Sequence, residues 1–408
     1  MPTTVLIGVV ILAGFVGGEL VRLLGLPRVT GYILAGLLLN PAVFPLIPES
    51  FPQAMQPVVD IALAFITFAI GGSLSMEKLR QTGAGLFALT LCEAAGAFVC
   101  IFAATGLFLL LIGSGGSGMQ QTAVIAAFAL LMASLGAPTD PSATLAVEHQ
   151  YGARGALSQA ILGIAAFDDA LGILIFSLGS DAAAAMMSST AEFSFAGVLA
   201  ETGYAVAGGA GLGILLGWGF NGICSRLRSF VQSEGSYMVL VLGLLCLGFG
   251  TAAYAGVDEL LTTMLTGVMV TNFNPRRQMI FRMMERYTEQ LIFLLFFVVS
   301  AMHIHFAFSF AVCALVFVFV AARAAGKWMG VAAGAAAAGF EASVRKYGAG
   351  GLIAQGGIVI GLALMLQSQP EFSAVAKMLL NAVMGATIVH EIIGPLFARL
   401  VLKRAGEI

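Results

Sequence analysis

Long apolar runs separated by short polar stretches dominate the chain from end to end. A helix needs about 20 consecutive apolar residues to cross a bilayer, and fewer where it is interrupted and surrounded by protein. The sequence therefore predicts about thirteen membrane-spanning helices, near 4–24, 30–46, 56–74, 83–112, 121–147, 155–178, 194–221, 236–254, 258–273, 288–303, 306–334, 350–368 and 374–401. The expected fold class is an all-α polytopic membrane protein that forms one transporter unit over residues 1–408.

The distribution of positive charge predicts the orientation of these helices. With the N-terminus outside and the C-terminus inside, most of the 19 lysine and arginine residues fall in cytoplasmic loops: Arg22, Arg28, Lys78, Arg80, Arg154, Arg226, Arg228, Arg276, Arg277, Arg282, Arg286, Arg345, Lys346, Arg399, Lys403 and Arg404. The loops on the other side carry mainly acidic residues, with Lys377 as the basic exception. Membrane proteins concentrate lysine and arginine in cytoplasmic loops, so the bias favours an odd number of crossings.

Composition supports a membrane protein and excludes several other classes. The chain is 59% hydrophobic and only 10% charged, with a mean hydropathy of +0.99, whereas soluble domains carry about a quarter charged residues. A net charge of -2 without a basic stripe gives no indication of nucleic-acid binding. We find no phosphate-binding glycine loop, no nucleophile elbow and no His/Cys metal spacing, so we expect neither an enzyme nor a bound cofactor.

A faint internal repeat indicates how the helices are organised. The stretch 31–40 aligns with 262–271, which places Gly36 on Gly267, and the Phe-rich stretch 65–74 aligns with 293–302. Because an odd number of crossings separates the two copies, the second copy would be inverted relative to the first. Inverted repeats are a common plan for secondary transporters.

A few ionisable residues fall at apparent membrane depth, where charge is costly and marks ion pathways. They are Glu93, Asp140, Asp168, Asp169, Arg323 and Lys327. Asp168 and Asp169 are adjacent and project about 100° apart on a helix, so they face different partners. We expect Lys327 to neutralise one of them, while Glu93 could either pair with Arg323 and brace the same helix or serve only in helix packing. A carboxylate in such a site holds either a proton or a cation, although a purely structural salt bridge is the alternative.

Two of the predicted helices contain interruptions. In the fifth, Pro138 and Pro141 flank Thr139 and Asp140, and proline breaks a helix by removing a donor and blocking a carbonyl. Free carbonyls, the Thr139 hydroxyl and the Asp140 carboxylate would then be oxygen ligands for a small cation, unless the prolines form only a structural kink. In the twelfth, glycines cluster around Gln355, which predicts a second break or, alternatively, close helix packing. Paired breaks at equivalent places in two repeats point to an ion site at the membrane midplane.

Several motifs together resemble the monovalent cation:proton antiporters, in particular the bacterial sodium/proton exchangers with paired aspartates. They are "LGLPRVTGYILAGLLLNP" (24–41), "PTDPSATLAV" (138–147), "FDDA" (167–170), "LLFFVVSAMHIHF" (294–306) and "ARAAGKWMG" (322–330). The resemblance implies two crossing broken helices, an ion-binding core of helices at about 83–178 and 306–401, and a dimerisation scaffold at about 4–74 and 194–303. The third predicted helix departs from the family, because Ser73 and Leu74 stand where many relatives have an acid.

The resemblance also assigns roles to residues. It implies that Asp169 is the main carrier of the proton or cation, that Asp168 pairs with Lys327, and that Thr139 and Asp140 lie against the same site. Arg323, Glu93 and Gln355 are possible supporting residues, and Asp169 and Asp140 are the expected Na⁺ ligands.

The expected function is antiport of protons against Na⁺ or Li⁺ by alternating access, electrogenic, in a homodimer that crosses the bacterial inner membrane many times. A K⁺/H⁺ antiporter and a sodium-coupled symporter of an organic anion are the alternatives.

Overall fold

The computed structural model describes residues 2–23, 28–112, 119–139, 153, 155–187, 195–226, 234–287, 289–302, 310–355, 358–373 and 375–408. All regular elements among these residues are helices, and none of the described residues lies in a strand. The chain divides into two compact units, which are described separately. The first contains Met1–Gly17, Tyr32–Gln81 and Leu199–His303, and the second contains Gly18–Gly31, Thr82–Val198 and Ile304–Ile408.

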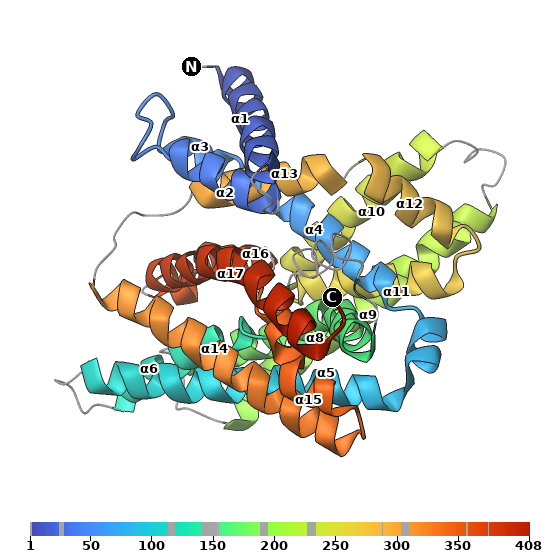
Figure 1. Ribbon diagram of the computed structural model, residues 1–408. Coiled ribbons are helices and arrows are strands. Elements are labelled where there is room, and N and C mark those ends of the chain that lie inside the picture. Colours follow the sequence, from blue (N-terminus) through green and yellow to red (C-terminus); the bar gives the residue numbers. More distant parts are fainter. Residues whose placement is uncertain are drawn as a thin grey trace. The chain divides into compact units, whose positions relative to one another are not determined.

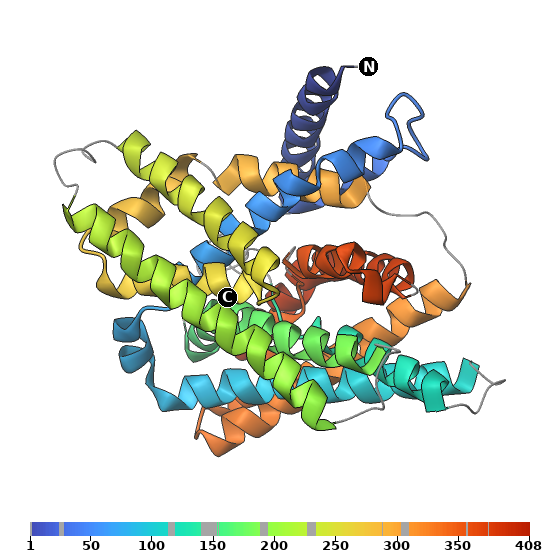
Figure 2. The ribbon, with the colours of Figure 1, turned by 180° about the vertical axis from the view of Figure 1, so that it is seen from behind.

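The first unit is built mainly from nine helices (Figures 1 and 2). They are α1 (Thr3–Leu23), α2 (Arg28–Leu38), α3 (Ser50–Ala54), α4 (Gln56–Ser73), α9 (Phe195–Arg226), α10 (Glu234–Ala255), α11 (Glu259–Phe273), α12 (Arg277–Tyr287) and α13 (Glu289–Met302). Aromatic and aliphatic side chains of α4, α9, α10, α11 and α12 form its core, which includes Phe68, Phe220, Tyr237, Val270 and Ile280.

Two close approaches in the first unit are reciprocal. A Cβ added to Gly36 on α2 would meet the carbonyl of Val298 on α13, and one added to Gly267 on α11 would meet the carbonyl of Phe68 on α4. These glycines are the pair that the sequence repeat aligns, and each packs on the Phe-rich helix of the other copy. A two-fold relation between the copies would generate this reciprocal pair of contacts, so the contacts support the predicted repeat.

The second unit contains the remaining helices (Figure 1). They are α5 (Met76–Ile112), α6 (Met119–Ser134), α8 (Ala156–Met187), α14 (Phe310–Ala337), α15 (Ala342–Tyr347), η1 (Gly348–Leu352), α16 (Ile358–Ser368), η2 (Pro370–Phe372) and α17 (Ala376–Ala405). The start of α5 is bent at Gly83, whose φ of 80° only glycine adopts readily, so the straight apolar part begins at the predicted position.

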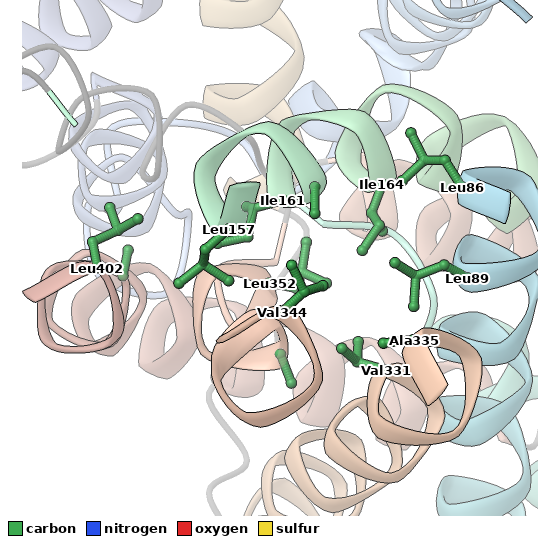
Figure 3. Close-up of a cluster of buried hydrophobic side chains, with 13 residues drawn as sticks. Leu86, Leu89, Leu157, Ile161, Ile164, Val331, Ala335, Val344, Leu352 and Leu402 are labelled. Carbon is green, nitrogen blue, oxygen red and sulfur yellow. The ribbon is translucent and has the colours of Figure 1, made fainter. Parts of the chain in front are cut away.

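An apolar cluster fixes how the helices of the second unit meet (Figure 3). Ile161 and Ile164 on α8 face Leu89 of α5, Val331 of α14 and Leu352 of η1. The C-terminal end of the described chain adds a polar contact, because the Glu407 carboxylate accepts hydrogen bonds from the backbone N–H groups of Leu157 (2.7 Å) and Ser158 (3.0 Å) at the start of α8. An acid at a helix N-terminus satisfies free donors and offsets the helix dipole.

Seven helices among the described residues are long and apolar enough to cross a membrane. They are Thr3–Leu23, Gly83–Ile112, Ala156–Met187, Gly203–Arg226, Glu234–Ala255, Phe310–Ala337 and Ala376–Ala405, and five shorter apolar helices accompany them. The expectation of a polytopic helical membrane protein is therefore confirmed. The number of thirteen crossings and their orientation stay predictions.

Both predicted interruptions are visible. The α6 helix ends at Ser134, four residues before Pro138, and residues 138–139 are not helical. At the second interruption, η1 ends at Leu352, residues 353–355 lie outside any helix, and α16 begins at Ile358. The amphipathic helix α12 was not predicted as a separate element.

Candidate functional site

Lys327, on α14, is the centre of a fully buried polar cluster in the second unit. Its Nζ contacts four oxygen atoms: Glu93 Oε1, the Ala137 carbonyl (2.8 Å), Thr139 Oγ1 (2.8 Å) and Asp168 Oδ2 (3.4 Å). An ammonium has three hydrogens to donate. The first three contacts take up these hydrogens, so the longer approach to Asp168 is chiefly electrostatic.

Thr139 links the lysine to Asp168. Its hydroxyl accepts a hydrogen bond from Lys327 and donates one to Asp168 Oδ2. Glu93, Asp168 and Lys327 have no exposed surface, and Thr139 is 1% exposed. Buried charges are tolerated when they are paired and hydrogen-bonded. Each carboxylate is paired through one oxygen, whereas Glu93 Oε2 and Asp168 Oδ1 are buried without a hydrogen-bond partner among the described residues.

Contacts between glycines bring Glu93 and Lys327 together. A Cβ on Gly326 would meet the carbonyl of Gly96, and a Cβ on Gly330 would meet the Cα of Glu93, so the backbones of α5 and α14 touch. Small residues of this kind allow membrane helices to approach closely. The sequence did not predict this contact, and Glu93 pairs with Lys327 rather than with Arg323, the partner that the sequence suggested.

The α8 helix supplies the two adjacent aspartates. A Cβ on Gly172, one turn after Asp168, would meet the Pro138 ring, so this face of α8 lies against the interruption that follows α6. Asp168 therefore faces the cluster and is sealed from solvent, whereas Asp169 is half-buried. The two adjacent residues, which were predicted to project in different directions, therefore differ in exposure.

The carbonyls at the first interruption are already hydrogen-bonded. Four successive ones each accept from a buried side chain: Leu135 from Gln355 (3.0 Å), Gly136 from Arg323 (2.8 Å), Ala137 from Lys327 (2.8 Å) and Pro138 from Arg323 (2.8 Å). Donors of positive charge suit this position, because the C-terminal end of a helix carries partial negative charge. The expectation that the break leaves carbonyls free as cation ligands is therefore wrong for residues 135–138.

Arg323 and Gln355 also reach the second interruption. Arg323 Nη1 donates to the Ile353 carbonyl (2.7 Å), so one guanidinium bonds to both broken segments. Gln355, with no exposed surface, lies at the second break and bonds to the first. His390 of α17, which sequence reasoning left without a role, contacts Gln355 Oε1 through Nδ1 (2.8 Å).

Of the residues that the sequence indicated, the structure thus brings Glu93, Thr139, Asp168 and Lys327 into one cluster, with Arg323 and Gln355 beside it. Asp140 lies outside the described residues. Within the part of the chain that is described, no group of three or more His, Cys, Asp or Glu side chains is arranged to hold a metal ion. If all four groups are ionised, Glu93 and Asp168 balance the charges of Arg323 and Lys327.

Comparisons with known proteins match nearly the whole chain and its fold. A family model for the transmembrane part of sodium/hydrogen exchangers matches residues 7–404. The fold is similar to that of the sodium/proton antiporter MjNhaP1 from Methanocaldococcus jannaschii at pH 8, with a TM-score of 0.76, 16% sequence identity, and 98% of each chain covered. A structure of the same antiporter from an electron-microscopy map gives a TM-score of 0.69 at 16% identity, covering 99% of this chain and 98% of that one. No curated protein matches the sequence.

Proposed function

The chain belongs to the sodium/hydrogen exchanger family, and from this we propose that it exchanges protons for a small monovalent cation, Na⁺ or Li⁺, by alternating access. The observation that carries the proposal is the buried cluster of Lys327, Thr139 and Asp168, placed where two interrupted helices meet. Burying a carboxylate and an ammonium together costs desolvation energy. In membrane proteins such groups mark ion and proton pathways.

We assign the exchange step to the adjacent aspartates. Asp169 is half-buried, so protons and cations can reach it more readily than they can reach sealed Asp168. Asp140 is proposed as a further oxygen ligand from the sequence alone. The cation and the proton compete for these carboxylates, and the core crosses between its inward-facing and outward-facing states only when the site is occupied.

The pairing with Glu93 affects the charge of Lys327 in this scheme. Because Glu93 pairs with the ammonium, Lys327 can keep its charge when a cation occupies the aspartates. The protons exchanged would then come from Asp168 and Asp169, and two protons per cation would make the exchange electrogenic. An electrogenic cycle responds to membrane potential, at about 2.3 kcal/mol per charge per 100 mV.

For the assembly we propose what the sequence led us to expect. We propose that the second unit contains the ion-binding core and that helices of the first unit form a homodimer scaffold. We also propose that the protein lies in the bacterial inner membrane with its N-terminus outside and its C-terminus inside. The bilayer, protons and the cation are then its partners.

A proteoliposome assay tests the exchange. Purified protein is reconstituted with a pH-sensitive dye inside the vesicles, and Na⁺, Li⁺ or K⁺ is added outside in separate runs. We expect outward proton movement with Na⁺ and Li⁺, and none with Asp169→Asn. Exchange at the wild-type rate in Asp169→Asn would refute the assignment of the carrier.

The same assay discriminates between the alternatives. A response to K⁺ but not to Na⁺ would identify a K⁺/H⁺ antiporter. Sodium uptake that needs an added organic anion and moves no protons would identify a symporter. The matched control is Asp60→Asn, an acid on α4 of the first unit, which we expect to retain cation-dependent proton movement.

A further inference from the structure

His390 is a buried residue of the second unit whose contacts reach the first interruption through another side chain. It lies on α17 with no exposed surface and contacts Gln355 Oε1 through Nδ1 at 2.8 Å. Gln355 Nε2 in turn donates to the Leu135 carbonyl at 3.0 Å. The chain of contacts therefore runs from α17 through the second interruption to the first.

The hydrogen bonds fix the protonation of the histidine ring. The amide nitrogen of Gln355 donates to Leu135, so the amide oxygen is its acceptor end, and the contacting nitrogen of His390 must carry a hydrogen. The neutral ring is therefore the Nδ1–H tautomer. Its Nε2 is buried and has no hydrogen-bond partner among the described residues. A second proton there would create a buried cation without an acceptor, which is unfavourable.

Two further contacts place His390 beside the second interruption. The Phe319 ring lies with its centroid 6.3 Å from that of the imidazole, on the helix that carries Arg323 one turn later. On α17 itself, one turn after His390, a Cβ on Gly394 would meet Ala354, the neighbour of Gln355. The helix therefore lies directly against the second interruption and holds the imidazole next to the amide.

The carbonyl that this chain of contacts reaches belongs to the ion-binding segment. Arg323 and Lys327 bind the next three carbonyls, and Thr139 follows immediately. We propose that His390 is a positioning residue for cation binding: by orienting Gln355 it fixes the Leu135 carbonyl and so the backbone that presents Thr139. This inference builds on the proposed exchange activity and assigns His390 a role without a change in its charge.

Substitutions that keep or remove the Nδ1–H donor test the proposal. The amide of Asn can donate from nearly the position of Nδ1, whereas Ala cannot. In the proteoliposome assay we expect His390→Ala and Gln355→Ala each to raise the KM for Na⁺ by about three- to tenfold, as the loss of one buried hydrogen bond implies. His390→Asn should restore the wild-type KM and keep the wild-type pH profile. The double variant should be no worse than either single variant, because both remove one chain of contacts.

The control is Val389→Ala, next to His390 on α17 and 37% exposed, which we expect to leave the KM unchanged. An unchanged KM in both alanine variants would overturn the proposal. So would a His390→Asn variant no better than His390→Ala. A flattened pH profile in His390→Asn would show instead that the ring titrates during transport.

A spectroscopic measurement separates this proposal from the proposed function. The chain has 4 histidines, so nitrogen-15 labelling of histidine gives a small set of ring signals in solid-state NMR. We expect one neutral Nδ1–H ring in the wild type, absent from His390→Asn and shifted in Gln355→Ala. A protein that shows this ring but moves no protons would refute the exchange activity alone. A protein that exchanges but has no such ring would refute the positioning role alone.

Discussion

Replacement of Glu93 by Gln should destabilise the second unit, because it removes the closest carboxylate from a buried ammonium. The remaining carboxylate, Asp168, lies 3.4 Å from Lys327 Nζ, longer than the usual charge-assisted bond of about 2.7–2.9 Å. Removing one partner of a buried pair costs about 3–5 kcal/mol, and a retained Gln–Lys hydrogen bond returns about 1 kcal/mol. We therefore expect a loss of about 2–4 kcal/mol in the free energy of unfolding.

The assay is thermal unfolding of the detergent-solubilised protein, followed by circular dichroism. A change of 1 kcal/mol shifts the Tm of a domain of 150–250 residues by about 2–4 °C, so a fall of several degrees is expected. The matched control is Glu77→Gln on the same helix. Its partner Arg277 lies 3.5 Å away and the Glu77 side chain is 67% exposed, so the loss should be below about 1 kcal/mol.

A double-mutant cycle isolates the pair itself. With Lys327→Met as the second change, the effects of Glu93→Gln and Lys327→Met should be strongly non-additive, because both remove one interaction. Additivity within about 0.5 kcal/mol, or a Tm loss in Glu93→Gln no larger than in Glu77→Gln, would refute the assignment of Glu93 as the counter-ion of Lys327.

Three further predictions concern the same unit. Thr139→Val removes the hydroxyl that lies between Lys327 and Asp168. The apparent affinity for Na⁺ in the proton-movement assay should therefore fall about tenfold, whereas Thr139→Ser should keep it. Equal effects of the two substitutions would contradict the hydrogen-bond argument. Gly326→Val should abolish folded protein on size exclusion, whereas Gly211→Val, where an added Cβ meets nothing within 4 Å, should elute normally. Clamping the vesicles at a negative inside potential should change the exchange rate, and a rate independent of potential would argue against two protons per cation.

The sequence predicted much of what lies near the site, because ionisable groups are conspicuous in apolar helices. Asp168, Lys327 and Thr139 were singled out by depth and by the prolines, and the structure places them within one cluster. Hydropathy reports how deep a residue lies, but not which neighbouring helix it faces. The sequence therefore suggested Arg323 as a partner of Glu93 and missed Lys327, since the α5–α14 contact at Gly96 and Gly326 decides that pairing.

The residues that satisfy the broken backbone were harder to predict. The prolines correctly indicated where α6 ends. The local sequence, however, does not show that side chains more than 180 positions away donate hydrogen bonds to the carbonyls that follow α6. His390 carries no motif, and its contact with Gln355 depends on the packing of α17 against the second interruption. The amphipathic α12 was missed because a search for long apolar runs passes over a short charged helix.

The ion pair between Glu93 and Lys327 joins residues 234 positions apart, and this separation sets an order on the synthesis of the protein. A ribosome adds about 5–20 residues per second, so Lys327 leaves it roughly 12–47 s after Glu93. For that interval α5 is present without its ammonium partner, and the carbonyls after α6 lack the arginine and lysine that will bind them. The first half of the unit therefore cannot reach its final state by itself, and early release of the chain would expose an acid-bearing helix to membrane quality control.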